Sequence, residues 1–258
     1  MKILYQWLLA NKISLNCDKT EIIFFRKPGQ EIPNIKIKLN GHRLYPSNYI
    51  KYLGVYIDEH LNGRFHCNLL LNELKRANGM LSKARHLISL AYLKMLYFAI
   101  FSSHLTYGCQ IWAQKQNIFN RKIHTAQNKA VRIMTFSHVR ASGKPIYGQL
   151  KILKLEHQIF LQNCLFVYDA LTNNSPNCFA SYFTVSRDIH NSGTRGATNN
   201  SIFVKHNETI KYGIQSITSQ CIFNWNHAIK TLKQDLLLLS RKKLIFLLKQ
   251  QFVQSYQN

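Results

Sequence analysis

Acidic side chains, which hold the metal ions of phosphoryl-transfer enzymes, are few and dispersed in this chain of 258 residues. Two-metal chemistry needs at least two carboxylates that converge on one point. The one adjacent pair among the 11 acids is Asp58-Glu59, and neighbouring side chains at the end of a strand point to opposite faces. We therefore expect Asp58 to act in a turn or a helix cap. The sequence also has no Gly-rich phosphate loop, no Gly-x-Ser-x-Gly turn and no His-Glu-x-x-His helix. It predicts no catalytic residue, no metal site and no cofactor in this chain.

The six cysteines are scattered and do not form the spaced pairs of a zinc site. They are typical of reduced, mostly buried thiols in an intracellular protein, so we expect a cytoplasmic or nuclear location. The N-terminal residues do not resemble a signal peptide, and no apolar stretch reaches the length of a membrane span. The sequence therefore favours a protein without membrane contact. The cysteines are Cys17, Cys67, Cys109, Cys164, Cys178 and Cys221.

Positive charge is the outstanding property of the composition. Lys and Arg number 34 against 11 acids, a formal net charge of +23, and such an imbalance favours a polyanionic partner, most often nucleic acid. Residues 60–140 contain 12 Lys and Arg but a single acid, Glu73.

Two basic stripes are expected on helices of this region. The outer face of a helical bundle normally includes acids, which are almost missing here. We therefore favour non-specific phosphate contacts along a nucleic-acid duplex. A glycine in the first stripe leaves room for a phosphate backbone to approach. The first stripe is Asn72, Arg76, Gly79 and Lys83, and the second is Lys122, Thr125, Lys129 and Arg132.

Four tyrosines lie near these cations and can stack on bases or sugars: Tyr52, Tyr56, Tyr97 and Tyr107. For Tyr97 and Tyr107 we expect core packing instead, because their sequence neighbours are apolar.

The elements that must position these residues change type along the chain. Residues 2–11 fit a short helix, 21–25 a strand and 50–57 another strand. Residues 35–39 and 42–45 predict a hairpin, because Asn40-Gly41 between them suits a type I′ turn. From residue 60 onward the apolar spacing becomes helical. The expected helices cover 70–88, 91–107, 118–134, 155–171 and 234–255, with an irregular linker near 173–207.

Several motifs together resemble the C-terminal part of the reverse transcriptase of non-LTR (LINE-type, jockey-like) retrotransposons. Trp7-Leu8-x-x-Asn11-Lys12-x-Ser14-Leu15-Asn16-x-x-Lys19-Thr20 resembles motif D of that family. Lys51-Tyr52-Leu53-Gly54-Val55-x-Ile57-Asp58 resembles motif E, the primer-grip hairpin. Leu105-Thr106-Tyr107-Gly108-x-x-x-Trp112 and Gln127-Asn128-Lys129-Ala130-Val131-Arg132-Ile133 resemble the helical thumb, and Ile189-His190-x-x-x-Thr194-Arg195 with Trp225-Asn226 resembles the tail beyond it. The usual Pro after Trp-Asn is replaced by His227.

The resemblance implies an α+β fold, with a small palm remnant at 1–58, a helical thumb at 59–140 and a helical C-terminal region at 141–258. It implies that Lys19 lies near the phosphates of the incoming nucleotide and that Lys51, Tyr52 and Gly54 hold the primer end. Arg76, Lys83, Lys122, Lys129 and Arg132 would then grip the RNA template and DNA primer duplex.

Catalysis in that family relies on a Phe/Tyr-Ala-Asp-Asp turn and an earlier Asp, which this sequence does not contain. The resemblance therefore implies a truncated fragment that lacks the fingers and part of the palm. The complete family enzyme uses Mg²⁺, and the fragment is expected to bind nucleic acid without polymerising. Two alternatives stay open: a domesticated, non-enzymatic RNA- or DNA-binding protein, and a helical interaction module whose C-terminal apolar helix is the contact surface. The oligomeric state is also open.

Overall fold

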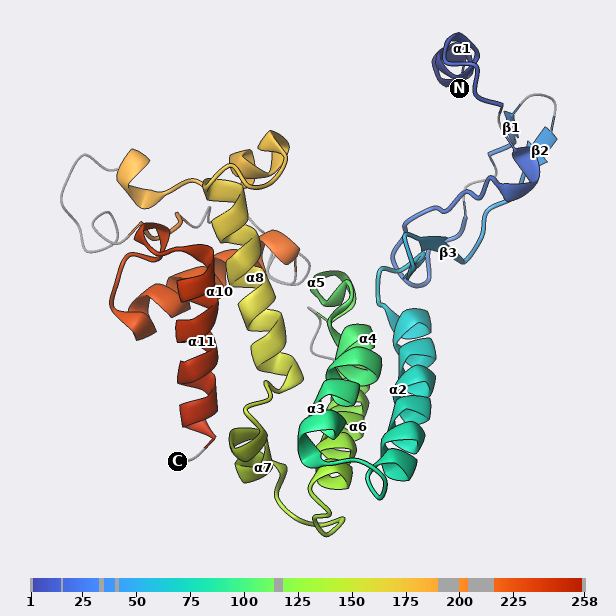
Figure 1. The fold of residues 1–258 in the computed structure, drawn as a ribbon. Helices are drawn as coiled ribbons and strands as arrows, with labels where there is room; N and C mark the ends of the chain where they lie inside the picture. The colour runs from blue at the N-terminus through green and yellow to red at the C-terminus, as the bar shows by residue number, and fades with distance from the viewer. Residues whose placement is uncertain are drawn as a thin grey trace. The chain divides into compact units, whose positions relative to one another are not determined.

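The computed structural model describes residues 2–14, 16–32, 35–39, 42–113, 118–189, 200–203 and 216–256. It divides the chain into two compact units, residues 1–68 and 69–258. Two small antiparallel sheets lie in the first unit, and helices make up most of the second (Figure 1). The α+β fold class expected from the sequence is confirmed.

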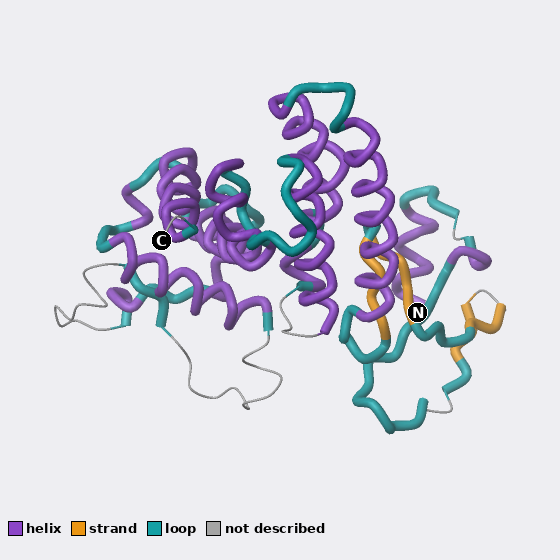
Figure 2. Tube along the Cα trace, turned by 90° about the horizontal axis from the view of Figure 1, so that it is seen from below, coloured by secondary structure: helices purple, strands orange, loops and turns teal. Residues whose placement is uncertain are grey.

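In its described residues the first unit contains the N-terminal helix, two separate hairpins, whose strands are orange in Figure 2, and the start of a helix that continues into the second unit. In the first hairpin Ile37 pairs with Leu44, and in the second Lys51 pairs with Tyr56. The elements are α1 (Lys2–Ala10), the 3₁₀ turn η1 (Cys17–Lys19), β1 (Ile37–Leu39), β2 (His42–Leu44), β3 (Tyr49–Tyr52) and β4 (Val55–Asp58).

The expected strand at 50–57 is a hairpin, as the family resemblance implies, and not one continuous strand. Leu53 and Gly54 both have positive φ, 45° and 84°, which is the backbone of a type I′ turn. The expected strand at 21–25 is wrong, since the structure gives it only an isolated bridge from Ile22 to Pro46. The expected Asn40-Gly41 turn lies outside the described residues.

Few hydrophobic side chains are buried in the first unit. Among its described residues these are Leu44, Val55 and Cys67, whereas large apolar side chains stay exposed along most of its length. The exposed ones include Ile3, Trp7, Leu9, Ile13, Phe25, Ile35, Tyr45, Tyr52 and Leu53. Because burial of apolar surface is the main driving force of folding, this unit has a weak core of its own.

Three helical segments form a bundle in the second unit. Its middle segment is continuous through a π-helical stretch, so the predicted helix at 91–107 is confirmed. Asn78 donates a hydrogen bond of 3.0 Å to the Ala126 carbonyl and so joins the first segment to the last. The helices are α2 (Arg64–Ala84), which begins before the division between the units, α3 (Leu90–Leu96), the π segment η2 (Tyr97–Ser102), α4 (Ser103–Thr106), the short α5 (Cys109–Trp112) and α6 (Ile118–Met134).

The C-terminal helices pack around a core centred on the fully buried Trp225. The bounds expected for α6 and α8 are confirmed, but α7 and α10 were not predicted. The helix expected at 234–255 is divided because Asp235 caps η5 and Ser240 caps α11. The elements around this core are α8 (Leu155–Leu171), the 3₁₀ turns η3 (Asn177–Tyr182) and η4 (Ser186–Asp188), α10 (Ile217–Leu232), η5 (Leu236–Leu238) and α11 (Arg241–Ser255). α7 (Gly143–Leu150) contacts α6 and α11 instead.

Part of the expected linker near 173–207 is packed into this core. Val185 and Ile202 are buried and form an antiparallel bridge. The Asn226 amide donates to the Ile202 carbonyl (2.9 Å) and accepts from the Ile202 N–H (2.8 Å), while the Trp225 indole donates to the Asn200 carbonyl (3.2 Å). The Trp225-Asn226 pair therefore holds residues 200–203 in place. Residues 190–199, which carry most of the Ile189-to-Arg195 motif, lie outside the described residues.

No helix within the described ranges has both the length and the hydropathy that crossing a bilayer requires.

Candidate nucleic-acid interface

The stem of the β3–β4 hairpin is fixed by aromatic packing. The Tyr49 ring stacks on Phe65 with centroids 3.9 Å apart, and Tyr56 meets Phe65 edge-on at 5.1 Å. The Tyr56 N–H donates to Nδ1 of His66 (3.4 Å), whose pKa is lowered by burial, so the ring is held in its neutral, accepting form. The hairpin thus rests on the first turn of α2.

The hairpin tip is exposed. Tyr52 is 62% exposed and Leu53 is 74% exposed, while the Lys51 ammonium lies 5.5 Å from the centre of the Tyr56 ring. Gly54 supplies the left-handed second position of the turn, which a Cβ disfavours. The structure therefore gathers three predicted site residues, Lys51, Tyr52 and Gly54, on one short, exposed turn.

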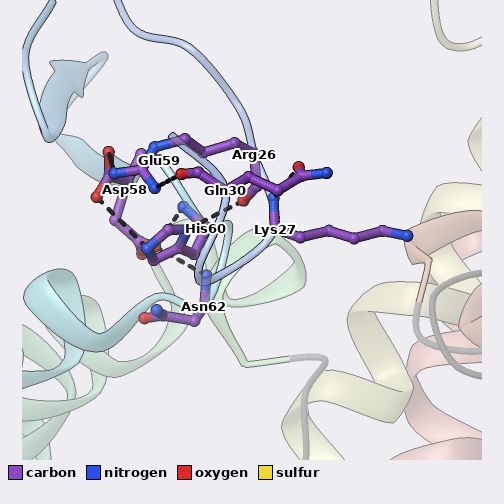
Figure 3. A network of polar contacts seen from close by, with 7 residues as sticks. All are labelled: Arg26, Lys27, Gln30, Asp58, Glu59, His60 and Asn62. Atoms are coloured by element: carbon purple, nitrogen blue, oxygen red, sulfur yellow. Dashed lines mark hydrogen bonds and ion pairs between the residues drawn. The ribbon is translucent and has the colours of Figure 1, made fainter. Parts of the chain in front are cut away.

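The adjacent acids at the end of this hairpin are used in local structure (Figure 3). The Asp58 carboxylate accepts hydrogen bonds from the backbone N–H groups of His60 (3.1 Å), Asn62 (3.0 Å) and Gly63 (2.7 Å). This arrangement confirms the turn role expected for Asp58 and organises the chain just before α2.

Glu59 is engaged elsewhere, in a link to the 26–30 turn. Its carboxylate pairs with the Arg26 guanidinium at 2.9 Å, and the Arg26 carbonyl contacts Nδ1 of His60 at 2.9 Å (Figure 3). The side chains of Asp58 and Glu59 therefore bind different partners and do not converge on one point. Over the described part of the chain, no group of three or more His, Cys, Asp or Glu side chains could hold a metal ion.

Lys19 ends the η1 turn with its side chain exposed. Asn16 fixes the turn, because its side-chain oxygen accepts the Lys19 N–H at 3.2 Å. Lys19 is thus available to a ligand from a defined backbone position.

The predicted stripe on α2 is exposed along its length, with Leu74 and Leu81 fully buried on the other side. A Cβ added at Gly79 would meet open space, as expected for a point of close approach. Arg76 pairs with Glu73 at 2.8 Å, with the two side chains 72% and 41% exposed. An ion pair that is open to solvent in this way is weak enough for a phosphate to compete.

The α2 stripe faces away from α6. Asn78 points to α6, and at 3.6 residues per turn Arg76 and Lys83 lie about 160° and about 140° around the helix from it. The stripes on α2 and α6 are therefore separate surfaces, a relation that the sequence did not reveal.

The α6 stripe is exposed at Lys122, Thr125 and Lys129. Arg132 differs from these, because it is half-buried and its Nε donates to the Ala141 carbonyl at 2.9 Å. Arg132 therefore fastens the turn that follows α6 and has less freedom to meet a phosphate. Nothing in the local spacing indicated this contact.

The bundle and the helix that follows it form a long acid-free region. From Leu74 to Leu155 the sequence has no Asp or Glu but 14 Lys and Arg. All of the cations of the α2 and α6 stripes and of the α6–α7 turn fall within it. Glu73, which borders the region and pairs with Arg76, is the acid nearest to the α2 stripe in the sequence, so few carboxylates weaken the attraction of these cations for a polyanion.

Two motifs of the bundle have structural explanations. Gly108 adopts a positive φ of 58°, and the Trp112 indole then donates to the Tyr107 carbonyl at 2.9 Å. Gln127 is fully buried and hydrogen-bonded to Tyr97 and Leu153. Core packing is confirmed for Tyr97, but it is wrong for Tyr107, which is 56% exposed.

Comparison with known proteins gives one informative relative. Over 158 residues, 60% of this chain, the sequence is 25% identical to an RNA-directed DNA polymerase from the mobile element jockey of Drosophila funebris. The matched region spans only 16% of that protein's length. No protein-family model matches the chain. No solved structure matches it either. The match supports a relationship between this chain and the reverse transcriptases of mobile elements.

Proposed function

We propose that this chain is the part of a non-LTR reverse transcriptase that grips the RNA template and DNA primer duplex, and that it binds without polymerising. The acid-free region from Leu74 to Leu155, with exposed cations on α2 and α6, is the observation that carries the proposal. Phosphate contacts of this kind are independent of sequence and supply most of non-specific affinity.

Most of the predicted residues have a direct role in this proposal, and Gly54 and Arg132 serve the local structure instead. Lys122 and Lys129 contact the phosphates of one strand, and Arg76 and Lys83 form a second contact on the outer face of α2. The hairpin tip, with Lys51 and Tyr52 exposed, holds the primer end. Lys19 meets the phosphates of the incoming nucleotide only within a complete enzyme.

The proposal is tested by fluorescence anisotropy with an RNA–DNA hybrid of about 20 base pairs at increasing salt. Duplex affinity falls with salt by a slope of about 0.9 per phosphate contacted. The double reversals Lys122→Glu/Lys129→Glu and Arg76→Glu/Lys83→Glu are each expected to lower the slope by about 2 and to weaken binding for all sequences alike.

A matched control is the reversal Lys230→Glu/Lys249→Glu, which makes the same charge change at exposed positions of α10 and α11. It is expected to leave the slope nearly unchanged. Equal losses from all three variants would mean that net charge alone drives binding, and the assignment to α2 and α6 would be wrong.

Polymerisation is expected to be absent in the isolated chain, with Mg²⁺ or any other divalent metal. Asp58 and Glu59 are already committed to the turns around the hairpin, and two-metal catalysis needs free, convergent carboxylates. Detectable extension of a labelled primer by the purified chain would refute this part of the proposal.

A helical interaction module is the second candidate. The sequence placed its contact surface on the C-terminal helix, but Leu244 and Leu248 of α11 are fully buried, and a different surface favours this candidate. On the outer side of α3 and η2, Tyr92, Met95 and Phe98 are 63%, 66% and 47% exposed at spacings that place them on one helical face. If the protein does not bind the duplex even at low salt, the nucleic-acid proposal is excluded and the interaction module is favoured. A domesticated nucleic-acid-binding protein would behave as the first proposal does.

A further inference from the structure

Phe136 has a backbone conformation that its side chain disfavours. It follows the end of α6 with φ of 54°. The Ser137 N–H donates to the Arg132 carbonyl (3.1 Å) and the Phe136 N–H to the Ile133 carbonyl (3.4 Å), which is a Schellman motif with phenylalanine at the position that glycine usually takes. A bulky residue with positive φ is a conformational outlier, and such outliers cluster at functional sites.

Burial does not explain this residue. Phe136 is 57% exposed, and Leu87 and Val139 in the adjacent turns are 83% and 79% exposed. The ring is held by two side chains from the turn after α2: the Arg85 guanidinium lies 4.6 Å from its centre, and the His86 ring meets it edge-on at 5.5 Å. The contact brings together the C-terminal ends of the two helices that carry the basic stripes.

The surroundings have the chemistry of a nucleotide site. The surface formed by Arg85, His86 and Phe136, here named the bundle-end surface, lies within the acid-free region. Arg140, four residues after Phe136 in the sequence, is also exposed. Single-stranded nucleic acid is bound by aromatic rings on which bases stack, next to cations that meet the phosphates. A paired base inside a duplex has no free face, so an exposed ring of this kind suits an unpaired base.

We propose that Phe136 stacks on an unpaired base of single-stranded RNA or DNA, with Arg85 supporting the ring and Arg140 meeting a neighbouring phosphate. The inference rests on the proposed nucleic-acid function and adds a second mode of binding to it, for the strand that continues beyond the duplex.

The decisive variant is Phe136→Gly, tested in the full chain. Glycine accepts the positive φ without strain, so the melting temperature is expected to stay the same or rise. Binding to an oligouridine of about 12 nucleotides is expected to weaken about 5- to 100-fold, the usual loss when one stacking ring is removed. Phe136→Trp keeps a stacking ring and is expected to retain binding.

Two controls separate stacking from other effects. An abasic oligonucleotide with the same number of phosphates should bind wild type and Phe136→Gly alike, because it has no bases to stack. Lys233→Gly makes the same backbone change at another positive-φ helix end, φ of 53°, and is expected to change oligouridine binding less than about twofold.

The possible failures are distinguishable. If wild type binds neither duplex nor single strand at low salt, the proposed function is wrong and this inference falls with it. If wild type binds with a steep salt dependence but Phe136→Gly binds oligouridine as tightly, only the inference is overturned, and Phe136 serves to join the ends of α2 and α6.

Discussion

Gln127 on α6 donates a hydrogen bond of 3.0 Å to the hydroxyl of Tyr97 on η2, and both side chains are buried. The same amide nitrogen donates to the Leu153 carbonyl at 2.9 Å, and the amide oxygen accepts the Leu155 N–H at 3.0 Å. One side chain therefore joins the middle and last segments of the bundle to the start of α8.

Replacing Gln127 with Ala is expected to destabilise the fold by about 3 kcal/mol or more. The change leaves a buried hydroxyl, a carbonyl and an N–H without their partner, and each such group costs about 1–3 kcal/mol. Urea denaturation of the variant gives the free energy of unfolding. Gln149→Ala, at an exposed position of α7, is the control and should change stability by less than about 0.5 kcal/mol. Similar losses for the two variants would contradict the bridging role.

Acid is expected to destabilise the C-terminal helices through His157. Burial lowers the pKa of His157 below its ordinary value of 6.5. The negative charge of Glu156 opposes this shift in pKa, and the positive charge of Lys154 adds to it. Below pH 6.5 the unfolded chain then binds more protons than the folded one, so the free energy of unfolding falls until the pH passes the folded pKa.

His157→Phe tests this pH dependence, since it preserves the stack on Phe252, whose centroid lies 4.2 Å from the imidazole. The variant is expected to lose less stability between pH 7 and pH 5 than wild type. Part of the fall should persist, because burial also lowers the pKa values of His66 and His124. An identical fall in both proteins would exclude His157 as its source.

Thiol labelling of the native protein is expected to be selective. Cys178 is exposed, whereas Cys67, Cys109 and Cys221 are buried in surroundings that raise their pKa values to about 12. Because the thiolate is the reactive form, a maleimide at neutral pH should modify Cys178 within minutes and these three only after unfolding. Peptide mapping by mass spectrometry identifies the labelled sites. Rapid native labelling of Cys221 would show that the α10 core is open.

Asn226 is expected to control the segment at 200–203. Its amide both donates to and accepts from the Ile202 backbone. Asn226→Ala loses both bonds, and Asn226→Asp keeps the acceptor while placing a carboxylate oxygen against the Ile202 carbonyl. Both variants should be cleaved by chymotrypsin after Phe203 faster than wild type. Equal cleavage rates would mean that the buried Val185 and Ile202 side chains alone hold the segment.

Helices with one clear apolar face were predictable from the sequence. The bounds of α6 follow from apolar spacing, and α2 shows the expected contrast between buried Leu74 and exposed Lys83. The bounds of α8 were also predicted, although its buried residues are not confined to one face. By comparison, α7 contains Gly143, Pro145 and Gly148, residues of low helix propensity, so its helix depends on tertiary packing. Local sequence did not predict the turn at Leu53-Gly54, because leucine is unusual at a position with left-handed backbone conformation.

The candidate site was less accessible to sequence reasoning than the fold. Exposure of Lys122, Lys129 and Lys83 follows from helical periodicity, but the bond from Arg132 to Ala141 does not. The Arg85–Phe136 contact does not follow from periodicity either, because it joins two turns that are about 50 residues apart in the sequence. It also requires a positive φ at Phe136, which a phenylalanine does not suggest. Contacts between turns that are distant in the sequence depend on how the helices pack, and helix packing cannot be predicted from a local sequence pattern.

The scarcity of buried side chains in residues 1–68 has a consequence for how the chain opens. Local stability follows the density of buried contacts, so backbone amides of β1 to β4 should exchange with deuterium long before those of α6 and α8. A macromolecule that covers Trp7, Leu9 and Leu53 would slow exchange in the first unit while leaving the second unchanged. Amide exchange in a mixture of candidate macromolecules would therefore detect a partner of this unit before that partner is identified.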